Sequence, residues 1–98
     1  MATEILSQAQ LTAAFIDLPG WTGDTSGLQR TYQFGSFKEA LSFMVRVGFE
    51  AEAMDHHPEW SNVYNRVSIT LRTHDAGNRV TAKDVALARK IQALAWVE

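Results

Sequence analysis

The stretch Val67-Ser68-Ile69-Thr70-Leu71-Arg72-Thr73-His74 alternates apolar and polar side chains. An alternation of period two is typical of a β-strand that buries one face, and it places His74 on the polar face with Arg72. The stretch Leu28-Gln29-Arg30-Thr31-Tyr32-Gln33-Phe34 alternates in a similar way, and it follows a short extended piece at Trp21 and a turn-rich segment at 23–27. These patterns indicate a β-hairpin and a later strand, and they predict an antiparallel sheet.

Three helix starts share one local chemistry. In each, a hydroxyl side chain stands three positions before a side chain that can reach back to the cap's own N–H, which is the pattern of a capping box. The pairs are Ser7 with Gln10, Ser36 with Glu39, and Thr81 with Asp84. We expect a first helix over about Gln8 to Asp17, a second from Phe37 to about His56, and a third that starts at Thr81.

The order of these elements predicts an α+β fold. An antiparallel sheet of about four strands should carry three helices on one face, in the order α-β-β-α-β-β-α. The chain has 98 residues and is 46% hydrophobic, so it fits one globular domain over residues 1–98. The second helix should have two packing partners, because its apolar surface is wide. One face carries Leu41, Met44, Val45, Gly48 and Phe49, and Phe43, Val47 and Met54 widen it.

Composition excludes several classes of function. The formal charge is -2, with 9 basic and 11 acidic residues interleaved, so no basic stripe is available for direct nucleic-acid binding. The absence of cysteine excludes disulfides, thiol catalysis and cysteine-based metal sites. No apolar run approaches the roughly 20 residues that span a bilayer, and the first residues lack the pattern of a signal peptide. We therefore expect a cytoplasmic protein without membrane contact.

All histidines of the chain fall in one region, at His56, His57 and His74. Imidazole exchanges protons near neutral pH, so such a cluster suits general acid–base chemistry. Pro58 should hold His57 in an extended conformation and end the second helix at about His56. Glu52 lies four positions before His56, so we expect the two on one helical face, with Glu52 orienting the imidazole. If the helix end and the strand end converge, the histidines meet over one concavity.

Other roles for these histidines are open. Taken singly, His56 at a helix end is more often a cap, and His74 before a turn is more often a hydrogen-bonding residue of that turn. Zinc binding is a second alternative, because imidazole is a common zinc ligand. Adjacent histidines, however, do not project to one point, and the usual i,i+4 or i,i+2 ligand spacings are absent. We therefore favour proton transfer and expect no metal.

A family signature runs through the same residues. Glu52, His56-His57-Pro58, Tyr64, His74 and Asp84, at the spacings they have here, resemble the signature of the pterin-4a-carbinolamine dehydratase family. Further segments typical of that family are spread over nearly the whole chain: Leu18-Pro19-Gly20-Trp21, His57-Pro58-Glu59-Trp60, Asn62-Val63-Tyr64-Asn65 and Thr73-His74-Asp75-Ala76-Gly77.

The resemblance implies a dehydratase that removes water from 4a-hydroxytetrahydropterin to give quinonoid dihydropterin. This reaction supports tetrahydrobiopterin recycling and links the protein to a pterin-dependent aromatic amino acid hydroxylase. The chemistry takes a proton from a ring nitrogen and protonates the departing hydroxide, so one base and one acid suffice. No cofactor or metal is implied. The resemblance also leaves open the alternative of a non-catalytic module, such as a dimerisation cofactor of a homeodomain transcription factor. The wide apolar surface of the second helix would supply the interface of such a module, and it equally predicts a homodimer or homotetramer.

The resemblance assigns roles to individual residues. It implies that His56, His57 and His74 are the three active-site histidines, and we favour His56 and His74 for proton transfer, with the acid and the base not distinguished. The implied pterin-binding residues are Glu52, Asp55, Pro58, Trp60, Arg72, Thr73 and Asp75. Tyr64 and Asp84 belong to the signature, but we expect structural roles for both, and Asp84 should complete a capping box. The loop Asn78-Arg79-Val80 departs from the family pattern and is one residue longer.

Overall fold

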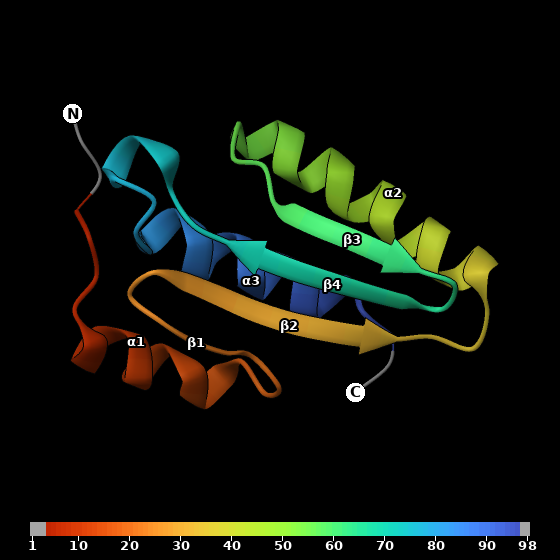
Figure 1. Cartoon of the computed structure of the whole chain (residues 1–98), viewed down its shortest axis with the longest axis horizontal. Coiled ribbons are helices and arrows are strands. Elements are labelled where there is room, and N and C mark those ends of the chain that lie inside the picture. The colour runs from red at the N-terminus through yellow and green to blue at the C-terminus, as the bar shows by residue number, and fades with distance from the viewer. Residues whose placement is uncertain (1–3, 97–98) are drawn as a thin grey trace.

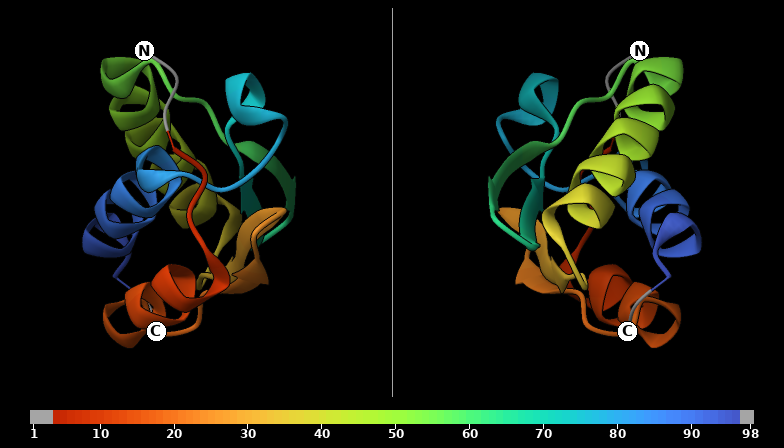
Figure 2. Two further views of the ribbon diagram at one scale, coloured as in Figure 1. Left: turned by 90° about the vertical axis from the view of Figure 1, so that its left-hand side faces the viewer. Right: turned by 90° about the vertical axis from the view of Figure 1, so that its right-hand side faces the viewer.

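The computed structural model describes residues 4–96, and its elements follow the predicted order (Figure 1). The helices are α1 (Gln8–Ala14), α2 (Phe37–Met54) and α3 (Ala82–Leu94), and short 3-10 helices follow at η1 (Phe15–Asp17) and η2 (His74–Ala76). The strands are β1 (Thr22–Asp24), β2 (Gly27–Gln33), β3 (Glu59–Val63) and β4 (Arg66–Leu71). They form one antiparallel sheet in the order β1-β2-β4-β3. Figure 2 shows the three helices on one side of this sheet, so the predicted α+β fold is confirmed.

The alternation read in β2 and β4 decides which face of the sheet is buried. Antiparallel register pairs Leu28 with Leu71 and Tyr32 with Val67, and all of these side chains are buried. The intervening residues of β2 point away from the helices and are exposed. The helix-covered face of the sheet is therefore the core, which is extended by stacked and tilted aromatic contacts of Tyr32 with Phe34 and Phe43.

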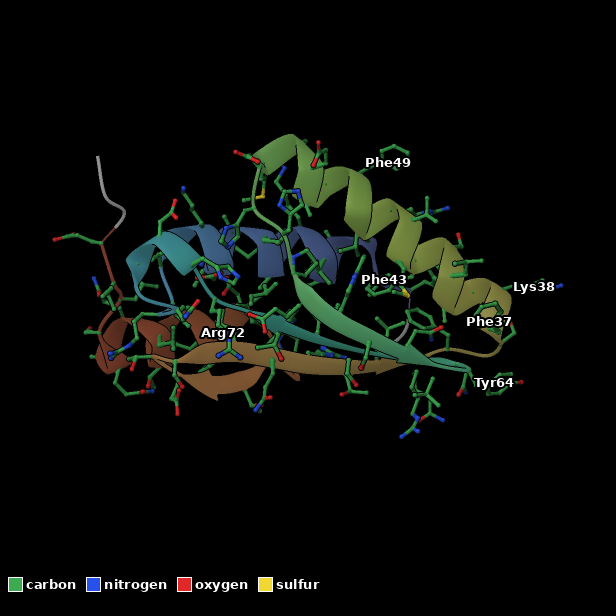
Figure 3. The ribbon with its side chains drawn as sticks, turned by 45° about the horizontal axis from the view of Figure 1, so that its top comes forward. Phe37, Lys38, Phe43, Phe49, Tyr64 and Arg72 are labelled. Atoms are coloured by element: carbon green, nitrogen blue, oxygen red, sulfur yellow. The ribbon has the colours of Figure 1, made fainter. Side chains whose placement is uncertain are left out.

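Helix α2 packs with a different face from the one that looked most apolar in the sequence. Its buried residues are Ala40, Phe43, Val47 and Ala51. Leu41, Val45 and Phe49 from the predicted face are 48%, 51% and 75% exposed. Figure 3 shows Phe43 on the inner side of α2 and Phe49 on its outer side. The helix thus has a second apolar surface, which no other described part of this chain covers.

Two of the three predicted capping boxes are complete. Ser7 and Gln10 exchange both hydrogen bonds at the start of α1, and Thr81 and Asp84 do so at the start of α3. At α2, the Ser36 hydroxyl accepts from the Glu39 backbone N–H, but the reciprocal bond is absent. The first helix is also shorter than predicted, because the chain narrows to 3-10 geometry at Phe15 before the turn at Pro19.

Helix α2 ends two residues earlier than predicted, at Met54. Asp55 adopts a left-handed conformation with φ 52°, and the next backbone N–H groups fold back onto the helix. The Asp55 N–H donates to the Glu52 carbonyl and the His56 N–H donates to the Ala51 carbonyl, each at 3.0 Å. This is the Schellman arrangement, and it places His56 outside the helix.

Strand β4 also ends earlier than the alternating pattern suggested, at Leu71. Thr73 instead forms an isolated antiparallel bridge with Arg79, and its N–H donates to the Arg79 carbonyl at 2.9 Å. His74 consequently opens the short η2 helix and does not lie on a strand. No helix within residues 4–96 is long and apolar enough to cross a membrane.

Candidate active site

The three histidines lie around one cavity of about 350 Å³. The end of α2 and the start of β3 supply one wall, and η2 and the first turn of α3 supply the other. The lining residues are Asp55, His56, His57, Pro58, Glu59, Thr73, His74, Asp75 and Lys83. Segments that are far apart in the sequence thus bring all three imidazoles, and four of the seven predicted pterin-binding residues, to the same place.

His56 is the buried histidine of the group, with 8% of its surface exposed. Its Nε2 lies 2.6 Å from Oδ1 of Asp84, which is fully buried at the third position of α3. The other carboxylate oxygen, Oδ2, accepts hydrogen bonds from the Thr81 N–H and the Thr73 hydroxyl, each at 2.8 Å. Because Asp84 acts as an acceptor toward these donors, we assign the proton of its contact with His56 to Nε2. That leaves Nδ1 as the basic nitrogen of the ring.

The hydroxyl chain behind Asp84 fixes its orientation. The Thr73 and Thr81 hydroxyls lie 2.7 Å apart, and both residues are buried. Since the Thr73 proton goes to Asp84, the Thr81 hydroxyl donates to Thr73 and accepts from the Lys83 N–H. The carboxylate therefore cannot rotate without breaking a buried hydrogen bond, and His56 is held with it.

The prediction that Glu52 orients His56 is wrong. Because α2 ends at Met54, His56 leaves the helical face that Glu52 occupies. Glu52 Oε1 instead lies 2.8 Å from Nε2 of His57, and both side chains are mostly exposed. Glu52 does not line the cavity, so its contact with the site runs through His57.

His74 is much more open to solvent than His56. Its side chain is 70% exposed, and its Nε2 lies 3.9 Å from Oε2 of Glu59. The same Glu59 oxygen lies 3.1 Å from Nε of Arg72. That nitrogen is buried and makes no hydrogen bond within the described residues, so the contact is an ion pair without hydrogen-bond geometry. The cavity thus combines one enclosed imidazole with exposed ones.

Two further predicted residues do not line the cavity. Trp60 is half-buried and packs against the hydrophobic core, so it has a structural position in this chain. Arg72 lies under a separate hollow beside Gly27 and Thr70 on the outer face of the sheet, and it reaches the site only through Glu59.

Sequence reasoning missed three residues of this site. Asp84 was expected only as a cap, and it is a cap and the partner of His56 at once. Glu59 belongs to the segment His57-Pro58-Glu59-Trp60, and its position directly after Pro58 could have indicated that it lines the cavity. Lys83 stands one position from Asp84, and no local pattern marks it. Within residues 4–96, no group of three or more His, Asp or Glu side chains is arranged to hold a metal ion.

Comparison with known proteins agrees with the signature. The family model described as pterin 4 alpha carbinolamine dehydratase matches residues 4–94. A protein of Opitutus terrae is 57% identical over 93 residues, with 95% of this chain and 96% of that protein covered. A protein of Mesorhizobium japonicum is 52% identical, with 93% and 94% covered. Both are provisionally named pterin-4-alpha-carbinolamine dehydratase.

Solved structures show the same fold. The crystal structure of a transcriptional coactivator/pterin dehydratase from Brucella melitensis superposes with a TM-score of 0.88 and 39% identity, covering 94% of this chain and 99% of that one. A pterin dehydratase-like protein identified as a RuBisCO assembly factor in the alpha-carboxysome shares the fold alone, with a TM-score of 0.64 and 24% identity over 80% of this chain and 89% of its own. The family model and these relatives show that the chain belongs to the pterin-4-alpha-carbinolamine dehydratase family.

Proposed function

We propose that this chain dehydrates 4a-hydroxytetrahydropterin to quinonoid dihydropterin by histidine acid–base catalysis. The observation that carries the proposal is the hydrogen bond of His56 to buried Asp84 at the wall of a cavity shared with His57 and His74. Family membership supports the same substrate class. In this role the protein returns the oxidised pterin of an aromatic amino acid hydroxylase to the tetrahydrobiopterin cycle.

The reaction needs one proton removed and one proton delivered. The N–H bond of the ring nitrogen beside the carbinol carbon breaks, and its electrons form the new carbon–nitrogen double bond. The carbon–oxygen bond then breaks, and the oxygen leaves as water after it takes a proton from an acid. The proton balance is zero, and positioned acid and base groups accelerate such steps by roughly 10²–10⁴-fold.

His56 suits the base in this scheme. Asp84 holds its Nε2–H, so Nδ1 is free to take the proton from the pterin nitrogen. Asp84 also lowers the free energy of the imidazolium that forms, because its carboxylate is already in contact with the His56 ring. His74 suits the acid, since its exposed ring exchanges protons with water between turnovers.

The remaining cavity residues suit the polar edge of a pterin. The aminopyrimidine ring of a pterin presents N–H donors beside a carbonyl oxygen. Carboxylates of Asp55, Asp75 and Glu59 supply acceptors for those donors, and the Lys83 ammonium can contact the carbonyl. The volume of about 350 Å³ is at the lower end for small-molecule sites, as expected for a compact bicyclic substrate.

Kinetics of His56→Ala and His74→Ala test the catalytic assignment. Both variants should lose about 10²-fold or more of the enzymatic dehydration rate, because each lacks one proton-transfer group. The rate is measured from the absorbance decay of the carbinolamine, with circular dichroism and solution mass as checks of folding. All histidines of the chain line the cavity, so the control is Gln33→Ala, at an exposed position of β2. A parent protein without turnover, or two variants with full turnover, would contradict the proposal.

We also propose that α2 mediates a homo-oligomer, either a homodimer or a homotetramer. Phe37, Leu41, Val45 and Phe49 repeat at every fourth position and are 45–75% exposed, so they form a continuous apolar stripe. The same stripe could serve a non-catalytic binding module, a possibility that is supported by the Brucella melitensis relative, which is described as a transcriptional coactivator as well as a pterin dehydratase. The intact histidine cavity favours the enzyme as the principal function.

A further inference from the structure

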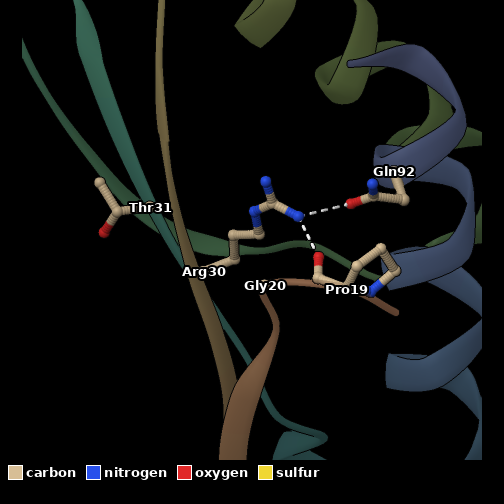
Figure 4. A pocket seen from close by; sticks show the side chains of 5 residues that line it. All are labelled: Pro19, Gly20, Arg30, Thr31 and Gln92. Carbon is tan, nitrogen blue, oxygen red and sulfur yellow. Dashed lines mark hydrogen bonds between the residues drawn. The ribbon is translucent and has the colours of Figure 1, made fainter. Parts of the chain in front are cut away.

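A second and larger cavity, of about 630 Å³, lies apart from the histidines (Figure 4). Its lining residues are Pro19, Gly20, Arg30, Thr31 and Gln92. It shares no residue with the histidine cavity. Arg30 occupies an inward-facing position of β2, and only 8% of its surface is exposed. This cavity therefore contains a cationic side chain in an unusual, largely buried position.

A hydrogen-bonded network fixes the Arg30 guanidinium. Its Nη1 donates to the Pro19 carbonyl and to Oε1 of Gln92, the latter at 3.0 Å. The Tyr32 hydroxyl donates to the same Gln92 oxygen at 2.7 Å, and the Tyr32 ring centroid lies 4.3 Å from Arg30 Cζ. Burial raises the pKa of the Tyr32 hydroxyl, so the phenol keeps the proton that it donates. The guanidinium is thus held in one orientation before any ligand arrives.

Gly20 adds to this restraint. Its φ is +84°, and a Cβ at this position would come within 2.5 Å of the Cζ and Nη1 atoms of Arg30. Only glycine combines this backbone conformation with such a close approach of the guanidinium. The turn at Pro19 and Gly20 is therefore shaped around the arginine.

The opposite edge of the guanidinium has no partner among residues 4–96. Both hydrogen bonds of the guanidinium come from Nη1, and Figure 4 shows them directed to one side of the group. Nε and Nη2 make none, and neither is sealed from solvent, because Arg72 Nε is the one buried side-chain nitrogen or oxygen without a partner in the described chain. The Nε–Nη2 edge of arginine is the planar fork that binds carboxylate and phosphate oxygens in pairs.

The charge of Arg30 is also uncompensated. None of the ion pairs within residues 4–96 includes it, and its acceptors are a neutral carbonyl and a neutral amide. A guanidinium is cationic throughout the physiological pH range, and a buried charge is normally paired. The cavity therefore provides a positive charge, a free fork of donors and space for a ligand.

We propose that this cavity binds a small oxyanion, a carboxylate or a phosphate, on the Nε–Nη2 fork of Arg30. Gln92 is the residue that makes the site available, because a carboxylate at its position would neutralise the guanidinium from within the fold. The site is independent of the histidine cavity and of the dehydration reaction.

Nuclear magnetic resonance titration of the whole chain tests the proposal. Sodium phosphate and sodium acetate are added separately at constant ionic strength maintained with chloride, and the Arg30 Nε–H and Trp21 indole N–H resonances are followed. Trp21 reports on the network because its Nε1 donates to the Tyr32 hydroxyl at 3.2 Å. A saturable shift with phosphate identifies a phosphate site, and one with acetate identifies a carboxylate site. If neither phosphate nor acetate produces a saturable shift, the proposal is overturned.

Gln92→Glu is the decisive variant. It should remain folded, because the new carboxylate pairs with Arg30 at the position of the amide oxygen, and it should bind the anion about tenfold or more weakly. Arg30→Lys keeps the charge without the fork and should weaken binding similarly. Arg89→Gln is the matched control, since that arginine is exposed on α3 and bonded to Asp17, and it should leave binding unchanged. Unaltered affinity in Gln92→Glu, or an equal loss in Arg89→Gln, would refute the site.

Discussion

Asp84 has two roles, because its side chain caps α3 and also orients His56. One carboxylate oxygen completes the capping box with Thr81, and the other contacts the imidazole of His56. The capping role was predictable, because the residues of a capping box stand at a fixed local spacing. The contact with His56 spans 28 positions and depends on how the end of α2 meets the start of α3. No local pattern encodes that meeting.

Asp84→Asn should separate the two roles of this residue. The asparagine oxygen can still accept from the Thr81 N–H, so the cap survives, but the amide cannot replace the carboxylate for both His56 and Thr73. We expect dehydration to slow by about 10²-fold and the pH profile of the rate to change, because His56 loses the group that fixes its tautomer. Urea unfolding should show that the free energy of unfolding falls by about 1–3 kcal/mol.

Asp17→Asn provides the carboxylate control for this experiment, since Asp17 is exposed and paired with Arg89 outside the cavity. Its rate and pH profile should match those of the parent. An unchanged pH profile in Asp84→Asn, with the rate intact, would assign Asp84 a purely structural role.

At the scale of elements, the sequence predicted what each segment forms better than where it ends. Alternation identified β2 and β4, because one face of each is buried and the other is solvated. The end of α2 was misplaced, because Asp55 adopts the left-handed conformation that usually selects glycine. Because the helix ends two residues earlier than predicted, Glu52 contacts His57 and not His56.

The outer face of α2 tests the proposed oligomer. Phe49→Asp should reduce the solution mass to that of the 10.9 kDa chain, because an aspartate in an apolar interface has no charged partner. Sedimentation or light scattering measures the mass. Ile16→Asp is the matched control, since Ile16 is 86% exposed but lies in η1 outside the stripe. A monomeric parent, or an unchanged mass in Phe49→Asp, would contradict an interface on α2.

At the scale of the whole molecule, the sheet and helices assemble a site that no single element contains. His56 and His57 follow α2, His74 opens η2, and Lys83 and Asp84 stand in the first turn of α3. Spacing in the sequence indicated which histidines converge, because the ends of neighbouring elements meet at one end of the sheet. It could not indicate their unequal exposure, which results from the packing of α3 behind His56.

The position of a bound pterin shows whether the histidine cavity is the substrate site. Crystals of the parent protein are soaked with an oxidised or reduced pterin, and the difference density is measured. We expect density in the cavity between His56 and His74, with the polar edge of the ring near the carboxylates of Asp55, Asp75 or Glu59. Density at another surface, or an empty histidine cavity at a saturating pterin concentration, would contradict it.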